Sequence, residues 1–352
     1  MNIFELINPT NLVAYWDATN ESQQNYLGDR LFPSRKVVGL ELSKISGRAG
    51  VPVTLKASAF DTQATYRERQ SIEMQKTNLM LFRERFRIDE TLRQQLLATS
   101  SQPVLQNLVE RIFDDASDLR RGAKATREKM IMQLITTGHV KIEGNGVKAD
   151  YDYGLNKAQK VTASTTWTDT VNSKPLQDLN DWVDYAQTKY GISMGYVIMS
   201  PRTFTFLKSS ESIAFALYPT ATNASKMFVT TQQVKDIVAA TTGLTVLVYK
   251  ETYKDEMFGT AKPFIPDGVV TLIPSSGVLG NMFFGTTPEE ADMLNNPRQS
   301  GNTTIIDTGV ALYRRLIDHP VSTEILCSQV CLPAFSSDVE NGAGTILIGK
   351  VD

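Results

Sequence analysis

The chain has 352 residues, of which 41% are hydrophobic, and a formal net charge of −2, so it can hold two subdomains and shows no overall charge typical of a polyanion binder. It contains no apolar run of about eighteen residues and no basic start followed by an apolar core, so we expect neither a membrane span nor a secretory signal. Its two cysteines, Cys327 and Cys331, are too few for a disulfide scaffold, which fits a reducing cytoplasm.

Residues 1–50 form the first predicted segment, which is basic and weakly apolar. Basic residues, Arg35 and Lys36 among them, outnumber acidic ones in its second half. Such a segment lacks the apolar surface needed for a core of its own. We therefore expect an arm that is either disordered or ordered on a neighbouring molecule.

Residues 51–88 alternate apolar and polar side chains at both ends of a charged centre that contains Arg67, Arg69 and Lys76. The two-residue period predicts strands with one covered face. A free two-stranded ribbon is only marginally stable in water, so a long one implies a partner surface. Arginines beside aromatic residues are also found in nucleic-acid sites, but the interleaved acids favour a solvated ribbon that faces a partner.

One long amphipathic helix is predicted from about residue 103 to residue 137. Small or apolar residues recur there at spacings of three and four: Leu105, Leu108, Val109, Ile112, Ala116, Leu119, Ala123, Met130 and Leu134. Pro103 and Gly138 suit its start and stop, and Gly122 is a candidate bend. The helix would be about 45 Å long, well beyond the globular average. Taken alone, it also suits the core of a large enzyme.

After this helix, Asn145-Gly146 between alternating segments predicts a β-hairpin over residues 139–153. Residues 175–300 then combine helical patterns with short apolar strands, which predicts a compact α+β unit of ordinary domain size. Two further strands are predicted at residues 320–332 and 345–351. We expect both to join the hairpin, so that one subdomain is discontinuous.

The sequence lacks the common catalytic patterns. It has no phosphate-binding GxxxxGK[ST], no GxGxxG and no GxSxG, and its only histidines are His139 and His319. Cys327 and Cys331 would share a face of one strand, but a zinc site normally needs tighter pairs and more ligands, so two reduced thiols are the better interpretation. Glu289, Glu290 and Asp292 suit a helix start. We expect no enzyme activity, no metal and no cofactor.

The order of these elements resembles the major capsid proteins of tailed bacteriophages with the Hong Kong 97 type fold, and more closely their lambda-type family. Gly195–Pro201 with Phe204 and Leu207 looks like that family's axial strand, proline turn and helix. Phe264–Gly268 followed by Leu279–Asn281 looks like its FLPD turn and strand, and Val321–Leu332 looks like its closing peripheral strand.

This resemblance implies an α+β shell subunit. Its parts would be an N-terminal arm (1–50), an extended excursion loop (51–88), a peripheral domain with the spine helix (89–174 and 301–352) and an axial domain (175–300). The charged residues expected to contact neighbouring subunits are Arg35, Lys36, Arg67, Arg69, Lys76, Arg120 and Arg121.

The resemblance also implies partners and a location. Pentamers and hexamers would close an icosahedral head around double-stranded DNA, without sequence-specific binding and without a membrane. A separate scaffolding protein, a portal protein at one vertex and a decoration protein are the further partners. The subunit would assemble in the host bacterial cytoplasm and end in the virion. An encapsulin-like compartment shell is the first alternative, and an α+β enzyme with an unrecognised site is the second.

Overall fold

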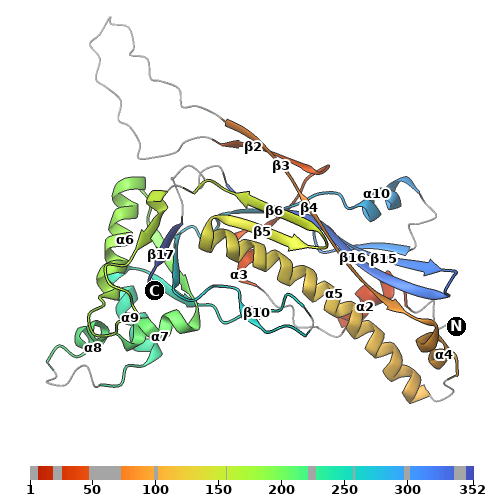
Figure 1. Cartoon of the computed structure of the whole chain (residues 1–352), viewed down its shortest axis with the longest axis horizontal. Coiled ribbons are helices and arrows are strands. Elements are labelled where there is room, and N and C mark those ends of the chain that lie inside the picture. The colour runs from red at the N-terminus through yellow and green to blue at the C-terminus, as the bar shows by residue number, and fades with distance from the viewer. Residues whose placement is uncertain are drawn as a thin grey trace, which may run out of the picture.

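The computed structural model describes residues 7–18, 26–46, 73–98, 102–155, 157–220, 227–256, 258–296, 302–336 and 346–352. Their buried apolar side chains form two clusters. The larger cluster lies between a long helix and a six-stranded sheet, and the smaller one lies between a five-stranded sheet and four helices. The two units lie side by side along the length of an elongated molecule (Figure 1).

The long helix is α5 (Gln102–Thr137), and its range confirms the helix predicted from the apolar spacing. Its 36 residues correspond to about 54 Å, and it runs without a break through Gly122 (Figure 1). Gly138 ends it with a positive φ of 79°, and a Cβ at that position would press against the side chain of Leu155. The spine of the larger unit is therefore one continuous helix with a glycine stop.

The six-stranded sheet is built around one 14-residue strand, β16 (Ser322–Phe335). On one side β16 pairs with β4 (Met80–Ile88). On the other side it pairs with β15 (Val310–Ile317) and β13 (Gly280–Phe284). The edges are β14 (Thr303–Ile306), which pairs with β15, and β1 (Ser34–Lys36), which runs parallel to β13.

The N-terminal segment differs from the expected coreless arm. Helices α2 (Pro9–Ala18) and α3 (Leu27–Leu31) lie against α5 (Figure 1). Leu12, Trp16 and Phe32 are buried in the larger cluster of the same chain. Average composition misled the prediction because a few large apolar side chains, spaced along a polar segment, supply enough surface to bind it to the spine helix.

The smaller unit contains the five-stranded sheet. Its strands, in spatial order, are β7 (Lys160–Thr162), β17 (Leu347–Lys350), β12 (Val269–Pro274), β8 (Met194–Met199) and β9 (Thr245–Val248). The helices beside it are α6 (Pro175–Tyr190), α7 (Pro201–Ser209), α8 (Glu211–Leu217) and α9 (Thr231–Thr242). Ser200 caps α7, and Thr230 with Gln233 forms a capping box on α9. These local signals fix where the helices begin.

The hairpin of β5 (His139–Gly144) and β6 (Val147–Asp152) confirms the Asn-Gly turn, since Asn145 and Gly146 both have positive φ. The expectation that the last two strands join this hairpin is wrong. Instead β16 is the centre of the larger sheet, and β17 pairs with β12 and β7 in the smaller one. Both strands are buried along almost their whole length, so each needs partners on both sides and covered faces, which a small hairpin cannot provide.

These pairings cross the expected division of the chain. Residues 346–352, expected in the peripheral domain, belong to the smaller unit, whereas β13, expected in the axial domain, belongs to the sheet beside α5. Each unit is therefore completed by strands that are distant in sequence.

Smaller elements of the described chain lie outside the two main sheets and their helices. A ribbon of β2 (Glu41–Ser46) and β3 (Glu73–Asn78) leads away from the body (Figure 1). A short hairpin of β10 (Thr252–Tyr253) and β11 (Lys262–Pro263) lies beside α5. The helices α4 (Glu90–Ala98) and α10 (Pro288–Asn295) and the 3-10 turn η1 (Lys157–Gln159) lie in connections. In the part of the chain described, no helix is long and apolar enough to cross a membrane.

Candidate functional site

The predicted contact residues Arg35 and Lys36 lie on the edge strand β1 and interact within their own chain. The Lys36 ammonium lies 2.5 Å from a carboxylate oxygen of Glu290 and donates to the Gly285 carbonyl at 3.1 Å. The Arg35 guanidinium lies 5.9 Å from the centre of the Phe283 ring. These side chains fasten β1 to β13 and to α10.

Arg120 and Arg121 are neighbours on α5 with different surroundings. Arg120 lies 3.0 Å from Asp307, in the turn between β14 and β15, and 5.2 Å from the centre of the Trp16 ring. Arg121 pairs with Asp118 at 2.8 Å, and both side chains are more than half exposed. Arg120 thus joins α2 and the sheet to the spine helix, whereas Arg121 faces outward.

Of the remaining predicted contact residues, only Lys76 lies among the described ones. Lys76 lies in β3 opposite Ser43 of β2. Arg67 and Arg69 lie outside the residues that the structure describes. The structure therefore brings Arg35 and Lys36 together and places Arg120 and Arg121 side by side on α5, and it does not unite the set into one site.

Four exposed arginines that sequence reasoning missed lie on the sheet face turned away from α5: Arg83, Arg85, Arg87 and Arg315. The strand register gives the direction of these side chains. Arg83 pairs with Ser328, and the next residue, Gln329, points to the opposite face of the sheet, where it contacts the spine helix. Arg83 pairs with Glu289 of α10 at 2.7 Å, and Arg85 pairs with the buried Glu324 at 2.9 Å. The alternating arginines of the sequence RERFR, residues 83–87, were the available signal.

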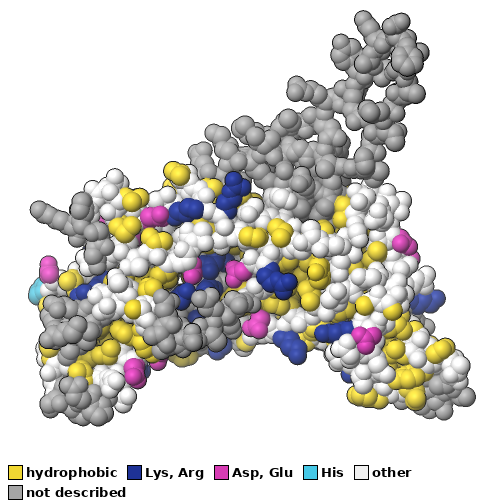
Figure 2. Space-filling view, turned by 180° about the vertical axis from the view of Figure 1, so that it is seen from behind, with side chains coloured by type: hydrophobic (Ala, Val, Ile, Leu, Met, Phe, Trp, Pro, Cys, Tyr) yellow, Lys and Arg dark blue, Asp and Glu magenta, His cyan; other side chains and the backbone are white. Residues whose placement is uncertain are grey.

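Exposed apolar side chains gather at the helical end of the smaller unit. Phe228, 79% exposed, precedes α9, and Phe215 on α8 is 51% exposed. Met227 is also exposed, and the Lys208 ammonium lies 5.0 Å from the centre of the Phe228 ring. Hydrophobic side chains are grouped at this end, at the lower right of Figure 2. A patch of this kind is a candidate contact surface for another molecule.

The loop between β10 and β11 carries a further exposed aromatic residue. Phe258 is 95% exposed, although Asp255 in the same loop is held to the spine helix. Asp255 accepts from Lys129 of α5 at 2.5 Å and from Lys262 at 2.7 Å. These hydrogen bonds to Lys129 and Lys262 lower the pKa of Asp255. An aromatic side chain on an anchored hairpin suits contact with another molecule, because little order is lost on binding.

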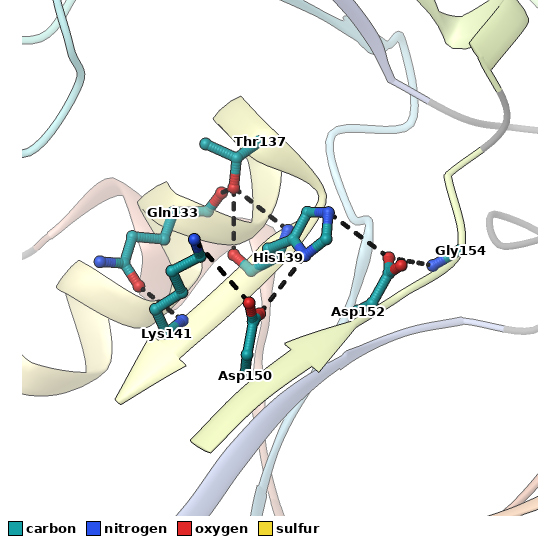
Figure 3. A network of polar contacts seen from close by, with 7 residues as sticks. All are labelled: Gln133, Thr137, His139, Lys141, Asp150, Asp152 and Gly154. Carbon is teal, nitrogen blue, oxygen red and sulfur yellow. Dashed lines mark hydrogen bonds and ion pairs between the residues drawn. The ribbon is translucent and has the colours of Figure 1, made fainter. Parts of the chain in front are cut away.

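His139, one of the two possible catalytic bases, lies in a surface network on the hairpin (Figure 3). Its ring nitrogens lie 3.3 Å from Asp150 and 3.6 Å from Asp152, and Lys141 also approaches Asp150. The network ties the two strands of the hairpin to each other and, through Gln133 and Thr137, to the last turn of α5 (Figure 3).

Cys327 and Cys331 are buried free thiols on β16. Burial raises the pKa of each thiol to about 12, so both stay protonated at neutral pH. Across the described ranges, no group of three or more His, Cys, Asp or Glu side chains could hold a metal ion. The prominent features of the described surface are thus its charged and exposed apolar side chains.

The family model named phage major capsid protein E matches residues 9–301. The chain belongs to this family. The match covers the spine helix, the ribbon and most of the smaller unit, and it confirms the resemblance inferred from the order of elements. The role of the family is that of a structural shell protein.

Solved structures agree on the fold. A protein assigned as the capsid protein of a prophage of E. coli CFT073 is 14% identical, with a TM-score of 0.60 over 98% of this chain and 99% of that one. A phage-related protein of Bordetella bronchiseptica RB50 is also 14% identical, with a TM-score of 0.53 over 97% of this chain and 96% of that one. The capsid protein of cyanophage A-1(L) is 10% identical, with a TM-score of 0.50 over 94% of each chain. No curated protein matches the sequence significantly. The α+β Hong Kong 97 type fold is thus confirmed over nearly the whole chain.

Proposed function

We propose that many copies of this chain close into an icosahedral head shell around the double-stranded DNA genome of a tailed phage. The observation that carries the proposal is the match of residues 9–301 to a major capsid protein family. The spine helix α5, the projecting ribbon and the two-unit architecture support it. A shell stabilises itself by repeating modest contacts around every subunit, and pentamers and hexamers are the repeating groups.

The proposed division of labour follows the two units. The unit with the five-stranded sheet serves as the axial domain, and Phe215, Met227 and Phe228 at its helical end contact the next copy around the pentamer or hexamer axis. The unit with α5 and the six-stranded sheet serves as the peripheral domain. Relative to the expected boundaries, residues 346–352 move to the axial domain and β13 moves to the peripheral domain.

The ribbon and the predicted cations supply the remaining contacts between subunits. Lys76 belongs to the ribbon that leads away from the body, and it contacts a neighbouring copy together with Arg67 and Arg69, which lie outside the described residues. Arg121 faces outward from α5, and Arg35 is exposed on the edge strand β1. Lys36 and Arg120 form ion pairs within their own chain, with Glu290 and Asp307. In a contact between subunits, they extend these ion pairs into a charge network with the neighbouring copy.

We propose that a separate scaffolding protein guides assembly in the bacterial cytoplasm and that a portal protein occupies one vertex. A decoration protein is a further candidate partner on the outside of the shell. The net charge of −2 suits a container that encloses a polyanion without gripping it. Correctly sized closed shells from this chain expressed alone would argue against the scaffolding protein.

The proposed role is structural, with no catalysis. It rests on the family match and on a described surface dominated by contact features. Electron microscopy of the purified full-length protein tests it: closed shells, tubes or rings of five and six subunits support the proposal. A stable monomer over the micromolar range overturns it. Particles that hold an enzyme in place of DNA would favour the encapsulin-like alternative.

A further inference from the structure

Glu128 lies near the C-terminal third of α5, at the meeting point of three parts of the chain. Its carboxylate accepts the backbone N–H of Gly28 in α3, with the nearer oxygen at 3.0 Å. It also lies 2.5 Å from the hydroxyl of Tyr249, which follows β9 of the smaller unit. The side chain is 1% exposed. One buried carboxyl group thus joins the N-terminal segment, the spine helix and the smaller unit.

The backbone is shaped to reach this carboxyl group. A Cβ on Gly28 would collide with the Glu128 carboxylate and with the side chain of Ile131. A side chain at position 28 would therefore force Glu128 and Ile131 to shift from their present positions. The contact thus depends on two features of the fold: the Glu128 carboxylate on α5 and the absence of a side chain at Gly28 of α3.

The charged groups that face Glu128 from the packed elements are acidic or neutral. Asp29 of α3 and Glu251, two residues after Tyr249, both disfavour a negative charge on Glu128. Tyr26 is the other titratable neighbour. The neighbouring cations on α5 have other partners: Arg127 binds Gln329, and Lys129 binds Asp255. Lys124, one turn earlier, interacts with Asp307 and Asp29.

Burial raises the pKa of Glu128 to about 7, which outweighs the lowering effects of its hydrogen bonds to Tyr249 and Gly28. In the neutral form, the carboxyl O–H can donate to the Tyr249 oxygen while the other oxygen accepts from Gly28. In the ionised form, the Tyr249 hydroxyl donates instead, and an uncompensated charge lies beside Asp29 and Glu251. Both forms keep the hydrogen bonds, but only the neutral form avoids the buried charge.

We propose that Glu128 is a proton-controlled clamp that holds α3 and the segment after β9 on the spine helix when neutral and loosens them when it ionises. The clamp lies within a single chain, so it goes beyond the proposed shell function and does not depend on it. It would make the joint between the two units, and the anchoring of the N-terminal segment, sensitive to pH in the neutral range.

Hydrogen exchange of the full-length protein, read by mass spectrometry between pH 5.5 and pH 7, tests this clamp. Wild type and Glu128→Gln are compared at each pH, which cancels the intrinsic effect of pH on exchange. Peptides that contain Gly28 and Tyr249 should open about tenfold more at pH 7 than at pH 5.5 in wild type, relative to the variant. If the ratio of wild-type to Glu128→Gln exchange in these peptides is the same at both pH values, the proposal is overturned.

Two further variants keep the test decisive. Asp255→Asn changes an ion-paired carboxylate in the same segment and should leave the wild-type pH dependence in place. Tyr249→Phe removes a hydrogen bond that favours the ionised form, so it should move the transition to higher pH. If Glu128→Gln does not fold, Tyr249→Phe decides the question, and an unchanged transition in that variant contradicts the clamp.

Discussion

The guanidinium of Arg127 on the spine helix donates to the side-chain oxygen of Gln329 on β16 at 3.2 Å. The amide nitrogen of Gln329 donates in turn to the Ala123 carbonyl of the same helix at 3.0 Å. Both side chains are buried, and the Arg127 guanidinium also lies 5.5 Å from the centre of the Phe284 ring. This pair fixes how the spine helix sits on the six-stranded sheet.

The first prediction is that Gln329→Ala destabilises the folded chain by about 2 to 4 kcal/mol. The change removes an acceptor from a buried cation and also leaves a cavity. Denaturant unfolding of the full-length protein measures the loss. Arg121→Ala, at an exposed ion pair on the same helix, should change stability by less than about 0.5 kcal/mol. A loss at Gln329 no larger than at Arg121 would show that the pair is not structural.

The second prediction concerns Ala116, which is fully buried inside α5. Ala116→Pro removes a helix hydrogen bond and places a ring against the preceding turn, so it should cost about 3 kcal/mol or more and abolish shell assembly. Circular dichroism and electron microscopy give the two readouts. Asp118→Ala on the exposed side of the helix is the control. Normal shells from Ala116→Pro would mean that an unbroken spine is not required.

Local signals made much of this fold predictable. The spacing of small and apolar residues gave the spine helix, and Asn145-Gly146 gave the hairpin, because both depend on neighbours close in sequence. Pairing between distant strands could not be read in the same way. The 14-residue β16 pairs with residues 80–88, 280–284 and 310–317. The sequence of a strand that is buried on both faces is largely apolar, so it does not indicate which strands pair with it.

The candidate contact residues were harder to predict than the fold. Charge alone suggested Lys36 and Arg120, yet each has an acid of its own chain within 3.0 Å. Phe228 and Phe215 were passed over because an isolated aromatic residue looks the same in sequence whether it is buried or exposed. Glu128 could not be singled out either, since its surroundings come from Gly28 and Tyr249, each more than ninety positions away.

The third prediction is that Cys327 and Cys331 of the native protein resist alkylation at pH 8. Both thiols are buried in the sheet, and their raised pKa of about 12 leaves almost no thiolate. Iodoacetamide labelling followed by mass spectrometry should show little modification until denaturant is added. Rapid labelling of either cysteine under native conditions would place that part of β16 at an accessible surface.

The fourth prediction is that Glu128 makes the folded state less stable as pH rises. The native pKa is about 7 and the unfolded value is 4.5, so between these values the native state binds more protons and loses stability with rising pH. The full effect is on the order of 3 kcal/mol and levels off above pH 7. Comparing unfolding free energies of wild type and Glu128→Gln at pH 5 and pH 7.5 isolates this contribution. A constant difference between the two proteins across that range would contradict it.

The fifth prediction is that Phe228→Ser weakens assembly without unfolding the subunit. Phe228 is exposed, so its removal takes no buried contact from the monomer core, whereas burying it against a neighbouring copy is worth about 1.5 to 3 kcal/mol. That loss should raise the protein concentration needed for assembly at least about tenfold, as measured by light scattering. Val147→Ser, at an exposed apolar position on the hairpin of β5 and β6, is the control and should assemble as wild type does. If Phe228→Ser assembles at the wild-type concentration with an unchanged melting temperature, the helical end of the smaller unit is not a contact between copies.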